Sequence, residues 1–183
     1  GNPWTSGTRH RKNGDSYEPL TIQFAKPLEN KAASMVERAL EEGLASIGAE
    51  LETTELPFEE LLQHYYRLTD RKYDMFFLAT NFGYVYDPYY DFNTADAYQG
   101  STNKTGLRDE QLMDLAMRMR MTSPSDLDGY MNAWFAFQER FIEVMPLIPL
   151  YSGIYRDIYS SERKGYDILQ YSSWAQAVLY ATM

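Results

Sequence analysis

Two prolines separated by three positions, Pro146 and Pro149, directly follow a stretch of aromatic residues at helical spacing. Proline has no backbone N–H and its ring fixes φ, so neither residue can lie inside a helix. We therefore expect the helix that begins near Pro124 to end near Val144. Beyond that point the chain must turn and continue as an extended segment through residues 146–151, which read P-L-I-P-L-Y.

Upstream of this segment, stretches with the apolar pattern of a strand alternate with stretches that have the apolar spacing of a helix. Short apolar runs at 20–24, 49–56 and 73–79 predict strands, and apolar residues at helical spacing predict amphipathic helices at 30–47 and 58–68. This succession builds a sheet covered by helices, with right-handed crossovers where neighbouring strands run parallel. The sequence therefore predicts the α/β class, with a mixed sheet flanked by helices.

Two further helices are predicted in the second half of the chain. Apolar residues at helical spacing mark one helix around 112–119. The other begins where Ser123 stands as an N-cap before Pro124, a residue favoured at the first helical position. We interpret the aromatic stripe of this second helix, which includes Trp134, as core packing.

The length of 183 residues allows one compact unit, since domains contain roughly 100–200 residues. Residues 1–17 are polar, contain several glycines and have no period, so we expect an irregular N-terminal segment there. Residues 18–183 are predicted to form a single α/β lobe.

Charge and cysteine content exclude several kinds of partner and site. The net charge is −9, from 17 basic and 26 acidic residues, whereas binding to nucleic-acid phosphates needs clustered lysine and arginine. The chain has no cysteine, which excludes disulfides and thiolate metal sites. No apolar run approaches the ~18 residues that cross a bilayer. We expect a monomer that binds no nucleic acid.

Residues 80–106 have no sustained period and are rich in tyrosine, aspartate, asparagine and glycine. A loop of this length is usually functional or disordered. It leaves the carboxyl end of the strand predicted at 73–79, where ligands gather in open α/β sheets. Tyrosine combines an apolar ring with a hydroxyl, so such a loop suits varied ligands, although the rings could instead cover the core of the lobe. The candidate ligand-binding residues in this loop are Asn81, Phe82, Tyr84, Tyr86 and Asp87.

Six short motifs in a fixed order span nearly the whole chain. They are W-T-S-G-T-R-H-R-K-N-G at 4–14, L-T-I-Q-F at 20–24, Y-D-M at 73–75, D-P at 87–88, N-K-T-G at 103–106 and P-L-I-P-L-Y at 146–151. Together they resemble the motifs of family 5 solute-binding proteins, the extracellular receptors of peptide and nickel ABC importers. Asn13 departs from the family pattern, because aspartate is usual at that position.

The resemblance implies the fold of the C-terminal lobe of a type II periplasmic binding protein, with the first lobe absent from this chain. It implies the substrate-binding component of a bacterial ABC importer, which holds a peptide or other small ligand between two lobes and delivers it to permease subunits. Peptide is the expected ligand. The resemblance further implies a lipoprotein at the extracellular face of the cytoplasmic membrane or a periplasmic protein, with no enzymatic activity and no cofactor.

The resemblance also adds Asn103, at the family's asparagine position beside the cleft, to the candidate ligand-binding residues. Peptide-binding members pair an aspartate just before the D-P turn with the α-ammonium group of the ligand. Here residues 81–88 read N-F-G-Y-V-Y-D-P, and Asp87 is the only acid. Asp87 is therefore either a ligand contact or a cap of the turn, which is the commoner role of aspartate before proline.

Two other classes of function are compatible with the residues. Asp87 and Asp91 lie four positions apart among aromatic residues, as the two carboxylates of a glycosidase-like enzyme would. Alternatively, the tyrosine-rich loop presents a protein–protein interaction surface. The only histidines are His10, in a basic segment, and His64, on a helix face predicted to be exposed. Neither a catalytic triad nor a multi-histidine metal site is expected.

Overall fold

The computed structural model describes residues 6–80, 86–153, 156, 158–166 and 174–182. The chain divides into two compact units. The first unit consists of residues 1–81 and 87–146, and the second of residues 82–86 and 147–183. The prediction that residues 18–183 form one lobe of a two-lobed protein stays a prediction.

An antiparallel hairpin occupies part of the N-terminal segment that is predicted to be irregular. Its strands are β1 (His10–Asn13) and β2 (Ser16–Pro19), with Asn13 opposite Ser16. Gly14 begins the turn with a φ of 60°, which glycine adopts without steric cost. All of β1 is exposed, so no alternation of apolar residues reveals the hairpin, and the prediction of an irregular segment is wrong there.

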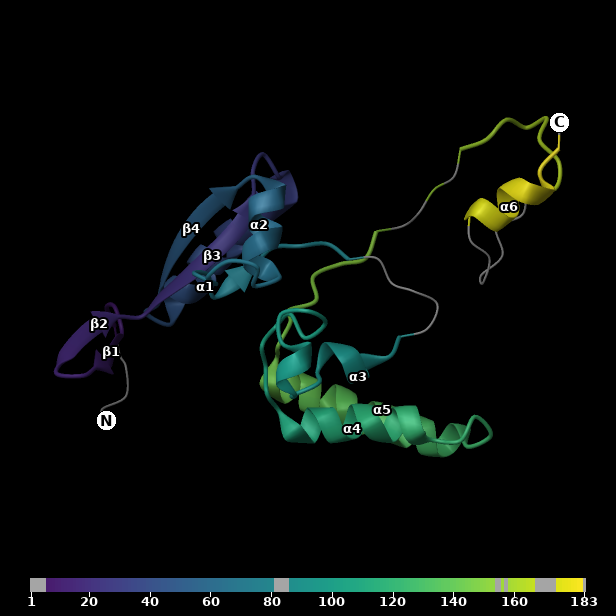
Figure 1. Cartoon of the computed structure of the whole chain (residues 1–183). Coiled ribbons are helices and arrows are strands. Elements are labelled where there is room, and N and C mark those ends of the chain that lie inside the picture. Colours follow the sequence, from purple (N-terminus) through teal and green to yellow (C-terminus); the bar gives the residue numbers. More distant parts are fainter. Residues whose placement is uncertain (1–5, 81–85, 154–155, 157, 167–173, 183) are drawn as a thin grey trace. The chain divides into compact units, whose positions relative to one another are not determined.

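A three-stranded parallel sheet forms the centre of the first unit's N-terminal half (Figure 1). The strand order is β4 (Glu50–Leu56), β3 (Thr21–Pro27), β5 (Met75–Phe76). The helices α1 (Lys31–Ser46) and α2 (Phe58–Tyr65) follow β3 and β4 in the chain. The α/β class is confirmed, with the parallel and antiparallel pairs in two separate sheets.

Short-range signals mark both ends of α1, close to the predicted range 30–47. The side chain of Asn30 accepts a hydrogen bond from the backbone N–H of Ala33 at 2.9 Å, which satisfies one of the free donors of the first turn. After the helix, Gly48 has a φ of 76°, the left-handed conformation that ends many helices.

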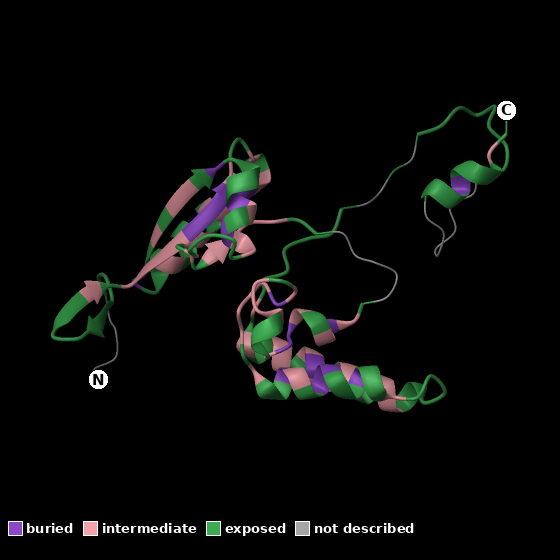
Figure 2. Cartoon of the chain, viewed as in Figure 1, coloured by how far each residue is buried: buried purple, intermediate pink, exposed green. Residues whose placement is uncertain are grey.

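Two kinds of contact hold this sheet. Leu61 of α2 is fully buried and packs with Ala25 and Leu56 of the sheet, and Figure 2 shows this buried surface along β3. On the same central strand Lys26 is only 4% exposed, and its ammonium group forms ion pairs with Glu37 at 2.6 Å and Glu55 at 2.8 Å. The hydrogen bond to Glu37 is the main reason why the pKa of Lys26 is raised.

The predicted loop 80–106 contains two short helices in its described part. These are α3 (Pro88–Asp91) and the 3-10 helix η1 (Asp96–Tyr98). They precede α4 (Glu110–Met121) and α5 (Leu127–Val144), which lie side by side (Figure 1). The core of this half consists of Phe92, Leu112, Leu115, Ala116, Met119 and Phe137.

The helix α5 ends at Val144, as the two prolines predict. The next residue, Met145, has a φ of 41° in the left-handed region. At the other end the predicted N-cap is wrong, because Asp126 caps the helix by accepting a hydrogen bond from the N–H of Gly129 at 2.9 Å. Ser123 lies in the turn before it, where its hydroxyl bonds Ser125 instead.

The described part of the second unit contains one helix, α6 (Trp174–Tyr180), which the sequence analysis did not predict. A β-bridge joins Lys164 and Thr182 in this unit. None of the helices in the described ranges is long and apolar enough to cross a membrane.

Candidate functional site

The predicted ligand-binding residues differ in how far the structure describes them. Asn81, Phe82 and Tyr84 lie outside the described residues. Tyr86 is described, and it is 43% exposed. Asp87 and Asn103 lie in the first unit, where the structure shows their partners.

Asp87 begins the short helix α3. Its Oδ1 accepts a hydrogen bond from the backbone N–H of Tyr89 at 3.0 Å. Pro88 follows at the first helical position, where its missing N–H removes no helical hydrogen bond. Asp87 therefore has the capping role that its sequence suggests as the alternative to ligand binding.

Arg120 of α4 contacts the other carboxylate oxygen of Asp87. Its Nη1 donates a hydrogen bond to Oδ2 of Asp87 at 2.9 Å, and its Nη2 donates to the hydroxyl of Tyr90 at 3.2 Å. The guanidinium carbon lies 4.6 Å from the ring centroid of Tyr89 and 4.9 Å from that of Tyr90. Arg120 thus joins α4 to α3 through two rings and a carboxylate, with the charge over the ring faces that attract it.

Asp87, Tyr89, Tyr90, Tyr98 and Arg120 form what we call the tyrosine–arginine cluster. The rings of Tyr89 and Tyr90 meet edge to face, with centroids 5.1 Å apart, and the centroid of Tyr98 lies 6.1 Å from each. Tyr90 is 41% exposed, and 37% of the Arg120 side chain is exposed. Part of the aromatic surface of the loop therefore faces solvent, and the cluster is the best candidate for a ligand-contacting surface among the described residues.

Hydrogen bonds and burial change the proton affinities around this cluster. The pKa of Tyr98 is raised, mainly because of its hydrogen bond with Tyr89. The pKa of Arg120 is raised above its already high value, first by the hydrogen bond to Tyr90, so Arg120 is always charged. Nearby, burial raises the pKa of the half-buried Asp91, and the positive charge of Lys104 partly offsets this.

Asn103 is fully buried, and its amide group is used completely by the loop around it. Its Nδ2 donates hydrogen bonds to the carbonyl oxygens of Asn93 at 3.0 Å and Leu107 at 2.9 Å. Its Oδ1 accepts from the hydroxyl of Thr105 and the backbone N–H of Gly106, both at 3.0 Å. A side-chain amide has two donors and two acceptor sites, so nothing is left for a ligand. Asn103 has the turn-forming role, and the ligand contact expected of it is not available in this structure.

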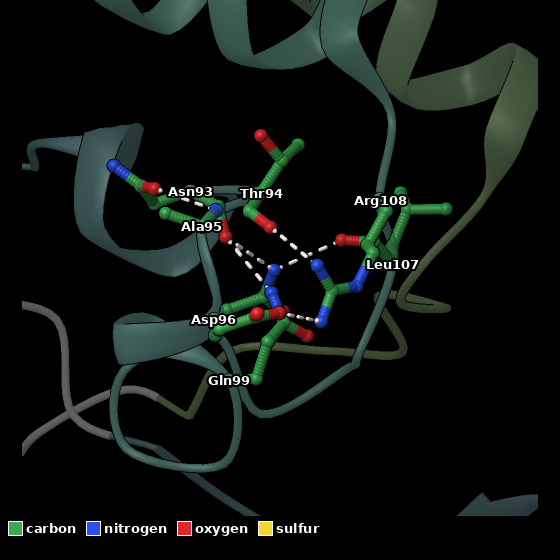
Figure 3. A network of polar contacts seen from close by, with 8 residues as sticks. Asn93, Thr94, Ala95, Asp96, Gln99, Leu107 and Arg108 are labelled. Carbon is green, nitrogen blue, oxygen red and sulfur yellow. Dashed lines mark hydrogen bonds and ion pairs between the residues drawn. The ribbon is translucent and has the colours of Figure 1, made fainter.

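A second set of polar contacts continues this network (Figure 3). Arg108 donates to the carbonyl oxygen of Thr94 at 2.9 Å and pairs with the carboxylate of Asp96 at 2.6 Å. The side chain of Gln99 donates to the carbonyl oxygen of Asn93 at 3.0 Å. The loop therefore satisfies its backbone with side chains where no helix or strand is present.

Arg71 connects this loop to the segment that precedes β5. Its Nη1 donates hydrogen bonds to the carbonyl oxygens of Lys104 at 2.9 Å and Thr105 at 3.1 Å. Gly106, with a φ of 75°, lies so close to Arg67 that a Cβ atom would be 1.7 Å from the Arg67 guanidinium. The ordinary sequence signals of a loop reveal neither contact, since each joins residues more than thirty positions apart.

The glycosidase hypothesis requires two carboxylates that are free to act as acid and nucleophile or base. Asp87 uses one oxygen to cap α3 and the other to pair with Arg120. Asp91 has a raised pKa, as an acid would, but the structure gives it no free partner carboxylate in Asp87. The geometry does not favour the glycosidase hypothesis.

The two histidines have different environments. His10 is exposed on β1. His64 is only 8% exposed, which makes the prediction of an exposed helix face wrong. Its Nδ1 donates to the carbonyl oxygen of Asp70 at 2.8 Å, and its ring meets Tyr73 edge-on at 5.2 Å. In the described ranges no group of three or more His, Asp or Glu side chains could hold a metal ion.

No protein-family model matches this chain, and no curated protein matches it. Solved structures share its fold. The oligopeptide-binding protein AppA from Bacillus subtilis, in complex with a nonapeptide, is similar over 76% of this chain, with a TM-score of 0.62 and 16% identity. The oligopeptide binding protein from Thermus thermophilus, complexed with a pentapeptide, is similar over 79%, with a TM-score of 0.64 and 17% identity.

A nickel protein has the same fold. NikZ from Campylobacter jejuni, in complex with Ni(L-His), is similar over 75% of this chain, with a TM-score of 0.57 and 16% identity. The chain spans 27–28% of the length of these three structures. The predicted resemblance is therefore confirmed for the fold: this chain has the fold of one part of the oligopeptide- and nickel-binding solute receptors.

Proposed function

We propose that this chain is part of the substrate-binding component of a bacterial ABC importer and contributes one side of a peptide-binding cleft. The observation that carries the proposal is the fold that it shares with two oligopeptide-binding proteins, both solved with a bound peptide. The chain spans 27–28% of their length. The proposal therefore places the other side of the cleft in a part of the receptor that this chain does not contain.

The chemistry of the tyrosine–arginine cluster supports a peptide ligand. Arg120 already holds the rings of Tyr89 and Tyr90 and the hydroxyl of Tyr90, so little side-chain freedom is lost on binding. Tyrosine rings pack against varied side chains, and their hydroxyls form hydrogen bonds with peptide groups. Asn81, Phe82, Tyr84 and Tyr86 stay predicted ligand contacts on the grounds of the sequence.

The proposal extends to partners and location. The receptor works as a monomer, delivers its ligand to ABC permease subunits, and is a lipoprotein at the extracellular face of the cytoplasmic membrane or a periplasmic protein. The net charge of −9 supports the absence of a nucleic-acid partner. A protein that binds and releases its ligand unchanged needs no catalytic group and no cofactor.

A nickel complex is the second candidate ligand, because the fold is also that of NikZ, which was solved with Ni(L-His). The two ligands make different demands on the cluster. A peptide gains from ring stacking along an extended chain, whereas a compact metal chelate covers much less aromatic surface.

The test uses the complete polypeptide that contains this chain, refolded from denaturant to remove any ligand retained during purification. Calorimetric titration with tetra- and pentaalanine is expected to show saturable binding, and with Ni(L-His) to show none. Binding of Ni(L-His) alone would replace peptide with nickel complex as the ligand. Binding of neither, or turnover of a chromogenic glycoside, would overturn the proposal.

Variants of the cluster locate the binding surface. Replacing Tyr90 by alanine removes a ring that is 41% exposed, and peptide affinity is expected to fall about tenfold, equivalent to about 1.4 kcal/mol. The matched control is Tyr17→Ala, which removes a 69% exposed ring from the β1–β2 hairpin and is expected to leave affinity unchanged. Equal effects of the two variants on peptide affinity would show that the cluster is not part of the binding surface.

A further inference from the structure

We propose that Arg120 binds a carboxylate group of the ligand, in a site built by the tyrosine–arginine cluster. This inference rests on the proposed function and deepens it, because it names the chemical group that one side of the cleft recognises. Three properties of Arg120 support this role: the way its guanidinium is held, its remaining N–H groups and the charge around it.

The guanidinium group of Arg120 is held in one orientation before any ligand arrives. The rings of Tyr89 and Tyr90 lie within 4.9 Å of its central carbon, and those two rings are nearly perpendicular, with an interplanar angle of 85°. Two hydrogen bonds, to Asp87 and to the hydroxyl of Tyr90, fix its rotation. The entropy cost of ordering a long side chain is therefore met on folding and not on binding.

The same guanidinium keeps donors for a further acceptor. Arginine has five N–H groups. The described residues accept hydrogen bonds from two of them, which leaves three, and 37% of the side chain is exposed. A carboxylate needs two donors in the plane of the guanidinium for the paired arrangement that arginine favours.

The charge around Arg120 decides which anion fits. Asp87 already balances the positive charge, so a ligand gains little from long-range attraction. The gain comes instead from short, directed hydrogen bonds over aromatic rings, which select a planar carboxylate over a spherical ion. Carboxylates of this kind occur at peptide C-termini and on acidic side chains.

A second arginine, Arg108, serves as an internal control. Arg108 is paired with Asp96 at 2.6 Å and donates to the carbonyl oxygen of Thr94. Its side chain is 53% exposed, more than that of Arg120. Like Arg120, Arg108 therefore has a carboxylate partner and an exposed side chain. Of the two arginines, Arg120 is the one with described ring contacts.

The first experiment follows the Nε–H signals of both arginines by NMR in the full 183-residue chain. The probe is acetyl-trialanine with a free carboxylate, titrated against the same peptide with a C-terminal amide. The Arg120 signal is expected to shift and saturate with the acid only, and the Arg108 signal to shift at most one-fifth as far. Equal shifts of the two arginines, or equal responses to acid and amide, would overturn the inference.

The second experiment uses Arg120→Lys, which keeps the positive charge and loses the planar pair of donors. The dissociation constant for the acid is expected to rise about tenfold or more, with that for the amide unchanged. The control Arg108→Lys should alter neither value. Should the Arg120 variant not fold, as judged by circular dichroism, the wild-type titration still decides the question.

Calorimetry on the complete polypeptide separates the inference from the proposed function. Equal affinity for tetraalanine and its C-terminal amide would leave a peptide receptor and overturn the carboxylate role of Arg120. A response of the Arg120 signal to the acid probe, with no binding of tetra- or pentaalanine by the complete polypeptide, would keep the carboxylate site and overturn the proposed peptide cleft.

Discussion

The parallel-sheet region, residues 20–77, and the loop region, residues 87–107, each contain a completely buried side chain that is stabilised in a different way. In the sheet region Leu61 is completely buried among apolar side chains. In the loop region Asn103 is also completely buried, and four hydrogen bonds satisfy its amide group. Burial of a polar group costs free energy unless the group is hydrogen-bonded. The loop region therefore depends on hydrogen bonds to every buried polar group, whereas the sheet region depends on close packing of apolar side chains.

This difference shows that the conformation of a segment without sequence periodicity can be fixed as firmly as that of a sheet. In the sheet region the backbone groups of one strand pair with those of its neighbours, and the side chains are free to follow a period. In the loop region the backbone carbonyl oxygens are bonded by the side chains of Asn103 and of two residues outside it, Arg71 and Arg108, as a neighbouring strand would bond them. Individual hydrogen bonds between residues far apart in the chain therefore fix the conformation of the loop.

The largest effect is expected from the centre of the loop region. Asn103→Leu removes four hydrogen bonds in a buried or partly buried setting, so the free energy of unfolding should fall by about 4 kcal/mol at about 1 kcal/mol per bond. Urea unfolding followed by circular dichroism measures it. The matched control Asn132→Leu, at an exposed position of α5, should change it by less than about 0.5 kcal/mol. A small effect of Asn103→Leu would mean that the loop is not held by its polar network.

A slightly smaller effect is expected in the sheet region. Leu61→Ala leaves a cavity between α2 and the sheet and should lower the free energy of unfolding by about 3 kcal/mol. Leu68→Ala, at a 74% exposed leucine, is the control and should be close to neutral. Hydrogen exchange sharpens the comparison: Leu61→Ala should speed amide exchange in the sheet strands, and Asn103→Leu chiefly in residues 93–107. Identical exchange patterns for the two variants would show that the regions unfold as one.

A pH-dependent effect is expected where the loop region meets α4. Asp109 caps α4 through the N–H of Leu112 and forms an ion pair with Arg140 at 2.5 Å. The hydrogen bonds from Arg140 are the main reason why the pKa of Asp109 is lowered. A lowered carboxylate pKa adds stability above the unfolded-state value, about 3.9, and this stability is lost as the pH falls through the folded-state value.

Arg140→Gln should therefore lower the melting temperature at pH 7, and the difference from the wild type should shrink as the pH falls below about 4. Thermal unfolding at pH 7 and pH 3 measures this. Arg11→Gln breaks the ion pair between Glu18 and a side chain that is 70% exposed, and it should have little effect at either pH. A difference for Arg140→Gln that stays constant with pH would assign its effect to packing.

The smallest effect is expected at the start of α5. Asp126→Ala removes the side chain that caps the helix and should lower the free energy of unfolding by about 1 kcal/mol. Ser123→Ala, at the position that the sequence marks as the cap, should change it by less than about 0.5 kcal/mol. The reverse order would restore the predicted start of the helix. Urea unfolding of the two variants side by side makes the comparison.

Much of the sheet region could be predicted, and much of the loop region could not. The helix α1 begins after Asn30 and ends before Gly48 because capping signals act on neighbouring residues. In contrast, His64 is buried because the chain after α2 folds back and offers it the carbonyl oxygen of Asp70. A helical pattern places His64 on a face but does not say what later covers that face.

The candidate site shows the same division. The density of tyrosine in residues 80–106 points to a functional loop, and the D-P pair anticipates the turn at Asp87. Arg120, which orients Tyr89 and Tyr90, carries no signal in the sequence, because it lies 33 residues after Asp87 on a helix of its own. Asn103 is picked out correctly as a special residue, but the sequence does not distinguish a ligand contact from a buried structural amide.

The amino-acid order alone establishes the α/β class, the run of strands and helices from residue 20 to residue 77, and the end of α5 before its two prolines. These properties follow from periods and caps, which act within a few residues. Only the tertiary structure decides that Arg120 lies over two tyrosine rings and that Asn103 faces the protein interior. The physical reason is that a hydrogen bond or ring contact depends on distance in space, and residues far apart in the chain meet only once the fold has formed.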